Sequence, residues 1–138
     1  MGSITPFGAA CGGTSNPVLA VTGTPEVARA LTARATGLVP SATLGWIVIG
    51  LSATTWNGAP LPADLGPIGI QGCDLRASID YSEGVVSAAS VVSRIYTMPN
   101  DPGLVGQHLY FQYFGASSTA TNSLGIVGAN AVDVLLGN

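Results

Sequence analysis

Short apolar runs separated by glycine and proline are the feature that most constrains the fold of this chain. Its 138 residues include 19 glycines and 9 prolines, spread along the sequence rather than clustered. Because glycine and proline favour turns and interrupt regular elements, this spacing is typical of many short strands joined by turns. The length corresponds to one domain. The sequence therefore predicts a single all-β domain, an antiparallel two-sheet sandwich of about seven to nine strands, immunoglobulin-like or jelly-roll-like.

Several segments have the composition of strands. Thr43–Ser52 is apolar on both faces and suits a central strand, in which Gly50 marks a bulge or a close backbone approach. Gln107–Phe114 alternates with the two-residue period of a strand. Val85–Met98 is a long β-branched run, which follows a turn predicted at Glu83-Gly84.

The remaining segments predict connections. Residues 1–16 are rich in Gly, Ser and Thr, and we expect an irregular N-terminal arm ahead of a sandwich at residues 17–138. Met1–Ser3 lacks the basic and apolar regions of a signal peptide and is interpreted as a remnant of expression. Asn57–Gly72 contains three prolines, which remove backbone donors and fix φ. We expect it to cross from one sheet to the other as an extended connection.

The segment from Thr24 to Leu38 fits two structures. Thr24 suits a helix cap, Pro25 suits the first helical position, and apolar side chains then recur on one helical face. This local pattern favours a helix. A strand over Val27–Thr36 would also place small and apolar side chains on one face, but it would place Arg29 there as well.

Charge is scarce in this chain. Only 8% of residues are charged, there is no lysine, and the net charge is −3. The four cations are scattered and form no basic stripe, which argues against nucleic acid and anionic membranes as partners; they are Arg29, Arg34, Arg76 and Arg94. The apolar stretch Leu44–Leu51 is too short to span a bilayer. Weak charge repulsion permits association between copies, and a neutral extracellular surface is the alternative explanation.

The chain has two cysteines, Cys11 and Cys73. An even number in a glycine-rich chain without lysine fits one disulfide, which would indicate a secreted or cell-surface protein. Closing a loop of this length would stabilise the fold by roughly 4 kcal/mol. Two buried free thiols in a cytosolic protein are the alternative.

The order of several short motifs resembles a β-sandwich module of secreted and surface proteins of planctomycetes and related environmental bacteria, often C-terminal in larger chains. The matching motifs run from Phe7 to Gly137 and are Phe7-Gly8-Ala9-Ala10-Cys11-Gly12-Gly13, Ile47-Val48-Ile49-Gly50-Leu51-Ser52, Trp56-Asn57-Gly58, Leu61-Pro62, Leu65-Gly66-Pro67, Gly72-Cys73-Asp74-Leu75, Pro99-Asn100-Asp101-Pro102, Leu104-Val105-Gly106, Tyr110-Phe111-Gln112 and Gly128-Ala129-Asn130-Ala131-Val132.

The resemblance implies a secreted module with a disulfide. It also implies a strand at Val27–Thr36, and we follow it over the local helix pattern, because sheet pairing often overrides propensity in alanine-rich segments. It implies no activity, because the function of such modules is uncharacterised. The chain departs from the pattern between Gly13 and Gly37, and again at Phe114-Gly115-Ala116, where relatives tend to carry an acidic residue. A metal held by that loop is therefore not expected here.

Residues for catalysis are not evident. His108 is the only histidine and is interpreted as a side chain on a strand face, since both cysteines are committed and no Gly-x-Ser-x-Gly elbow exists. Most of the seven acidic residues lie beside turns. Calcium bound through Asp80, Glu83 or Asp101 stays open, although no calcium-loop spacing is present. We therefore expect no enzyme, no cofactor and no metal.

Aromatic side chains are the remaining candidates for binding. Most are expected in the core, but Trp56 lies beside the Asn57-Gly58 turn, and Tyr110 and Tyr113 are further candidates for a ligand. The sequence predicts a non-catalytic extracellular structural or adhesion module that associates with copies of itself or contacts envelope proteins. A carbohydrate-binding module that uses surface aromatics is the alternative, and a hydrolase is the third hypothesis.

Overall fold

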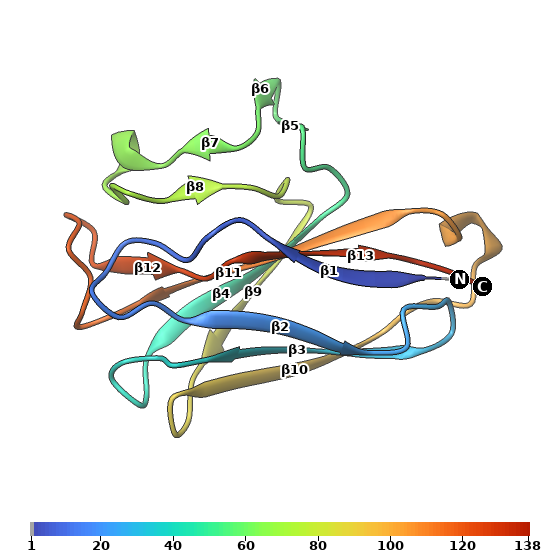
Figure 1. The fold of residues 1–138 in the computed structure, drawn as a ribbon, viewed down its shortest axis with the longest axis horizontal. Helices are drawn as coiled ribbons and strands as arrows, with labels where there is room; N and C mark the ends of the chain where they lie inside the picture. Colours follow the sequence, from blue (N-terminus) through green and yellow to red (C-terminus); the bar gives the residue numbers. More distant parts are fainter. Residues whose placement is uncertain (1) are drawn as a thin grey trace.

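The computed structural model describes residues 2–138, and it confirms an all-β fold with two main antiparallel sheets and two short two-stranded ribbons, β5-β6 and β7-β8 (Figure 1). The large sheet follows the order β1-β13-β11-β4-β9, with β12 beside β11. Its strands are β1 (Ser3–Phe7), β4 (Leu44–Gly50), β9 (Tyr81–Val86), β11 (His108–Ala116), β12 (Ile126–Gly128) and β13 (Ala131–Leu135). The small sheet follows the order β10-β3-β2, formed by β2 (Val18–Gly23), β3 (Ala30–Thr36) and β10 (Val91–Thr97).

The core lies between the two sheets and follows from the alternation of side chains. On β11, Leu109, Phe111 and Tyr113 point inward, and on β3, Leu31 and Ala33 do so. The small alanines of β3 and the large aromatic rings of β11 belong to the same buried cluster. The other buried residues of this cluster are Leu19, Val21, Ala35, Leu38, Ile47, Val85, Val92, Met98, Ala129, Val132, Val134 and Leu136.

The segment that fitted both a helix and a strand is a strand. β3 covers Ala30–Thr36 and lies in the middle of the small sheet, where it pairs with β2 and β10. The helix favoured by the local pattern is wrong, because pairing on both sides and burial of alternate side chains outweigh helix propensity. Arg29 is kept out of the core because it precedes the strand, in a turn where Ala28 has a φ of 63°.

The connection between β4 and β9 does not cross between sheets, contrary to expectation, because β4 and β9 are neighbours in the large sheet. The segment 51–80, which we call the excursion, folds over the outer face of that sheet (Figure 1). It contains β5 (Thr55–Trp56), β6 (Ala59–Pro60), β7 (Ala63–Asp64), β8 (Asp74–Leu75) and the short 3-10 helix η1 (Gly66–Ile68). Its apolar side chains cover Val48 and Phe114, so both faces of the large sheet are partly buried.

The two ends of the excursion are tied together where it leaves the sheet. Ser78 donates its N–H to the carbonyl of Ser52 at 2.8 Å, and Asp80 accepts from the N–H of Leu51 at 2.8 Å. Ser78 lies against Gly50 so closely that a Cβ at Gly50 would overlap the Ser78 carbonyl oxygen. The close approach predicted at Gly50 is therefore confirmed.

Cys11 and Cys73 form the predicted disulfide, with their Cα atoms 5.2 Å apart. The bond joins the N-terminal segment to the excursion across 62 positions of sequence. That segment is not an irregular arm throughout, since Ser3–Phe7 forms β1 by pairing with β13. Of the residues Met1–Ser3 interpreted as a remnant of expression, Met1 lies outside the described residues and Ser3 begins β1.

The β-branched run of Val85–Met98 belongs to two strands rather than one. β9 contains Glu83 and Gly84, so the turn predicted there is wrong. The chain reverses at residues 87–90 instead, where Ala89 and Ser90 adopt φ values of 52° and 66°. A second 3-10 helix, η2 (Pro102–Leu104), follows β10 and is capped by Asp101. No helix within residues 2–138 is long and apolar enough to cross a membrane.

Candidate functional site

Trp56 lies at the rim of an apolar groove between the excursion and the outer face of the large sheet. The groove has a volume of about 330 Å³, and Trp46 on β4 also lines it. The two indoles are 36% and 37% exposed, so both are accessible from solvent. Ser82 is the single polar lining residue; the others are Val48, Leu65, Ile68, Ile70, Leu75, Ile79, Phe114 and Ile126. The groove therefore suits an uncharged, largely apolar group.

Tyr110 lies elsewhere, on the part of the outer face that the excursion leaves uncovered. Its ring stacks on the imidazole of His108, with centroids 5.7 Å apart, and meets the edge of the Phe7 ring at 6.1 Å. Burial, followed by the negative charge of Asp133, raises the pKa of the Tyr110 phenol. Tyr110 is half-buried and lines neither the groove of Trp56 nor the other cavities described in residues 2–138.

Tyr113 belongs to the core, which corrects its prediction as a ligand-binding residue. Its side chain is fully buried between the sheets, because its position in β11 has the same parity as Phe111. The phenol lies against Gly45 and Gly115, which face each other in register on β4 and β11. Burial raises the pKa of the Tyr113 phenol. A ligand in solvent cannot reach this ring.

His108 lies on a strand face and contacts Asp133. The His108 Nδ1 and Asp133 Oδ1 atoms are 2.7 Å apart, and both side chains are partly exposed. Within residues 2–138, no serine, threonine or cysteine side chain hydrogen-bonds to the imidazole. The pair therefore lacks the adjacent nucleophile that a catalytic triad requires.

The three acidic residues considered for calcium are engaged separately. Asp80 accepts from the Ser78 hydroxyl at 2.6 Å and from the Leu51 N–H, and these two bonds lower the pKa of its carboxyl. Asp101 caps η2 by accepting from Gly103 at 2.9 Å. Glu83 contacts β10. Among the described residues 2–138, no three His, Cys, Asp or Glu side chains gather into a metal-binding group.

The two sides of the sandwich are open because the sheets differ in width. A six-stranded sheet faces a three-stranded sheet, so the flanking strands of the large sheet have no partner sheet fully over them. One open side lies between β1 and β2, and the other lies between β9 and β10. Each side holds an apolar cleft and two strand edges, and an unpaired edge is a template for another strand.

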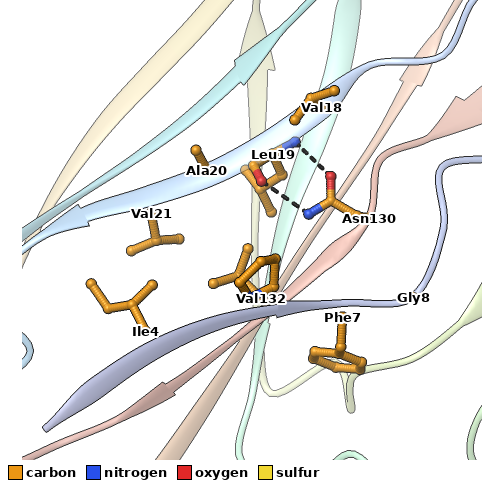
Figure 2. A pocket seen from close by; sticks show the side chains of 10 residues that line it. Ile4, Phe7, Gly8, Val18, Leu19, Ala20, Val21, Asn130 and Val132 are labelled. Carbon is orange, nitrogen blue, oxygen red and sulfur yellow. Dashed lines mark hydrogen bonds between the residues drawn. The ribbon is translucent and has the colours of Figure 1, made fainter.

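The side at β1 and β2 holds a cleft of about 720 Å³, in which Ile4 and Val21 face each other (Figure 2). The antiparallel ladder turns the backbone groups of Ile4 and Pro6 away from β13. Pro6 has no N–H, so the free edge of β1 lacks a donor at that position. Proline at such a position blocks the addition of another strand.

Asn130 protects the free edge of β2, the second strand on this side. Its side-chain amide accepts from the N–H of Leu19 and donates to the C=O of Leu19, both at 3.0 Å (Figure 2). These two bonds copy those that a neighbouring strand would make. Asn130 therefore caps β2 at Leu19, and it leaves the outward backbone groups of Val21 free.

Asn130→Ala is expected to lower the free energy of unfolding by about 1–2 kcal/mol, because two partly buried hydrogen bonds are lost. Uncapping β2 is also expected to increase association at that edge. Urea unfolding and light scattering measure the two effects. Asn130→Asp is a second comparison: it retains an acceptor for the Leu19 N–H, but it replaces the donor with a charged oxygen facing the Leu19 carbonyl, so it should also be less stable than the wild type. An unchanged unfolding curve for Asn130→Ala would contradict the capping role.

The side at β9 and β10 holds a cleft of about 670 Å³. Its lining combines aromatic and aliphatic residues of both sheets, namely Ile49, Tyr81, Ile95, Tyr96, Thr97, Met98, Pro99, Leu104, Leu109, Phe111 and Leu136. Glu83 of β9 spans the gap between the sheets: Tyr96 donates its hydroxyl to Glu83 at 2.6 Å, and Arg94 lies 3.4 Å from it. Burial, followed by the bond to Glu83, raises the pKa of the Tyr96 phenol.

The outward backbone groups at β9 and β10 can be assigned from the ladders. The N–H of Met98 donates to the carbonyl of Arg29, which directly precedes β3. Because backbone groups alternate in direction along a strand, the N–H and C=O groups of Ser93, Ile95 and Thr97 point away from β3. The N–H of Ser87 donates to the carbonyl of Thr43, which precedes β4. By the same alternation, the backbone groups of three β9 residues point away from β4, and these residues are Ser82, Gly84 and Val86. None of these six has a backbone or side-chain partner among residues 2–138.

The strand edges were missed in the sequence. Asn130 was noted only as part of a motif, and Glu83 was assigned to a turn. Alternation showed which face of a strand is buried, but not which strands lie at an edge. The prolines offered the available signal, because Pro6 within an apolar segment is typical of an edge strand.

Comparison with known proteins gives no relative: no protein-family model, no curated protein and no solved structure matches this chain. The resemblance to planctomycete surface modules stays a prediction. The disulfide is typical of proteins that fold in an oxidising compartment, and an extracellular location is consistent with it.

Proposed function

We propose that this protein is a non-catalytic structural module of an extracellular or cell-surface assembly, and that it associates with copies of itself or with envelope proteins. The observation that carries the proposal is the set of unpaired strand edges beside apolar clefts on the open sides of the sandwich. Such edges bind other strands through the main chain and obtain specificity from alternate side chains.

The composition of the surface supports this proposal. Soluble β-proteins guard exposed edges with charged side chains, and above all with lysine. This chain has no lysine and only four arginines. Long-range repulsion between copies is therefore weak, and contacts would consist of apolar, hydroxyl and backbone groups. The disulfide supports a location outside the reducing cytosol.

Light scattering coupled to size exclusion tests the proposal, with unreduced protein loaded over a wide range of concentration. A defined oligomer or a larger particle is expected at high concentration. Because few charges are involved, raising the salt concentration should change the association little. A strict monomer of 13.8 kDa at every concentration would refute the self-association part of the proposal.

A second candidate function is glycan binding in the groove of Trp56, favoured by one observation. Two indoles, Trp46 and Trp56, line the same cavity and are each about one-third exposed. Indole faces stack on the apolar faces of sugar rings, but Ser82 is the single polar side chain available to the hydroxyls.

Trp56→Ala is expected to remove at least about tenfold of any affinity for an uncharged polysaccharide, since an aromatic anchor contributes about 1.4 kcal/mol or more. Affinity electrophoresis in gels that contain cellulose derivatives, xylan or β-glucan measures the retention. Tyr110→Ala is the matched control, because Tyr110 lies outside the groove. Equal retention of Trp56→Ala and the wild type, or no retention of the wild type, would rule out this site.

A further inference from the structure

The side of the sandwich at β9 and β10 lacks both devices that guard β1 and β2. Neither β9 nor β10 contains a proline, and within residues 2–138 no side chain caps their outward backbone. The charged side chains Glu83 and Arg94 contact each other across the gap between the sheets. Natural proteins block edges that must stay free, so this contrast between the two sides indicates a surface that a further chain covers.

We infer that this side is a two-fold contact with a second copy of the chain, in which β9 of each copy pairs with β10 of the other. The inference rests on the proposed function, because it names the surface through which copies associate. The two pairings would continue each sheet of one copy into the opposite sheet of its partner. Such an interface is self-complementary, as a two-fold contact requires.

The direction and length of the strands fit this pairing. β9 and β10 are consecutive and run in opposite directions, so a two-fold axis parallel to the strands places β9 antiparallel to β10 of the second copy. Each edge then offers three residues whose N–H and C=O groups point outward and are unpaired. Two such edge pairs would satisfy the free backbone groups of β9 and β10 in both copies.

The unequal widths of the sheets select this arrangement over β10 against β10. The floor of the cleft is formed by Ile49, Tyr81 and Leu109 of the large sheet, which therefore extends beyond β10. If β10 paired with β10, the projecting β9 strands of the two copies would meet first. With β9 against β10, the projecting strand of each copy fits the recess of the other.

Charge favours the same arrangement. β9 carries Glu83 and β10 carries Arg94, and both point into the gap between the sheets. Pairing β9 with β10 of the second copy brings opposite charges together, whereas pairing like strands would set Glu83 near Glu83 and Arg94 near Arg94. Like charges placed opposite each other destabilise a strand pair.

Three of the exposed side chains at this side are apolar, and they lie beside the exposed Arg94 on β10. Ile95 on β10 and Val86 on β9 are 70% and 68% exposed, and Tyr81 is half exposed. Their neighbours with outward backbone are Ser82, Gly84, Ser93 and Thr97, none of which is charged. A second copy would bury these groups against residues of the same kind, which is the composition expected at the centre of an interface.

The first test substitutes one exposed apolar residue on each edge of the small sheet. Ile95→Lys places a charge at the proposed contact, and Val18→Lys, at a residue 57% exposed on β2, is the matched control. We expect Ile95→Lys to raise the dissociation constant of the oligomer at least about tenfold, and Val18→Lys to leave it unchanged. Urea unfolding of each variant verifies that the fold is retained.

The outcomes separate this inference from the proposed function. If the wild type is monomeric at all concentrations, the proposed function and the inference both fail. If the wild type associates and Val18→Lys dissociates it while Ile95→Lys does not, the proposed function stands and the contact lies at the other side. Dissociation by Ile95→Lys alone supports the inference.

The second test distinguishes the two possible strand pairings. Ile95→Cys is mixed under mild oxidation with Ser82→Cys, Gly84→Cys or Val86→Cys. Each of these three positions of β9 has backbone groups that point outward. A disulfide between unlike chains is expected in at least one mixture, because residues opposite each other in a ladder lie within reach of the bond. Cross-linking of Ile95→Cys to itself, with none in the mixtures, would overturn the pairing of β9 with β10.

Discussion

Replacing both cysteines, Cys11→Ser with Cys73→Ser, is expected to lower the free energy of unfolding by about 4 kcal/mol. The disulfide closes a loop whose ends are 62 positions apart, and the chain-entropy description gives this magnitude for a loop of that size. It also joins two segments that pack together in the second apolar cluster, where Cys73 is fully buried beside Leu75 and Ile70. Urea unfolding, followed by tryptophan fluorescence, measures the loss.

Reduction of the wild type provides the control for this prediction. Because the bond itself carries the effect, wild type unfolded in the presence of a reductant should lose nearly the same free energy as the double variant. Trp56 lies in the excursion that the bond anchors, so its fluorescence should respond at a lower urea concentration than in the oxidised protein. A loss below about 1 kcal/mol in both experiments would contradict the anchoring role.

Tyr113→Ala is expected to cost about 3–5 kcal/mol, the range for removal of a large aromatic side chain from a core. The ring is fully buried and fills the space left by Gly45 and Gly115, so its removal opens a cavity between the sheets. Tyr113→Phe is expected to leave stability unchanged or to raise it by up to about 1 kcal/mol. The reason is that the Tyr113 hydroxyl is buried without a hydrogen-bond partner among residues 2–138.

The comparison of these two substitutions separates packing from hydrogen bonding. Both variants are measured by urea unfolding, and the difference between them isolates the contribution of the ring. A loss of more than about 1 kcal/mol in Tyr113→Phe would show that the hydroxyl has a partner, such as a buried water, and would contradict this account of the core.

Much of the sandwich could be predicted from sequence, because burial imposes a two-residue period on strands. The alternation in Gln107–Phe114 is that of β11, and the apolar run of Thr43–Ser52 is that of β4, which is paired on both sides in the large sheet. The local pattern gave the wrong element where local and distant forces disagree, whereas the strand implied by the resemblance over Val27–Thr36 agrees with β3. Residues 24–38 favour a helix locally, but β2 and β10 pair with β3 from both sides and fix it as a strand.

The candidate surfaces could not be predicted in the same way. An edge is defined by the absence of a neighbour, and neighbours in this sheet order come from distant parts of the chain. Trp56 could be identified, since its turn favours exposure, but Trp46 joins it only because the excursion folds back over β4. Tyr113 was misplaced because a tyrosine on an alternating strand can face either the core or the solvent. The pairing of β11 with β4 places its phenol against Gly45, which is distant in sequence, and Gly115.

Amide hydrogen exchange at low and high protein concentration, measured by NMR on the unreduced protein, tests most directly whether strand edges mediate association. The account predicts that the outward amides of Ser93, Ile95 and Thr97 exchange freely in dilute protein. At high concentration their exchange should slow at least about tenfold, while the amide of Val21 is unchanged. Exchange at these three amides that does not depend on concentration would contradict association through this edge.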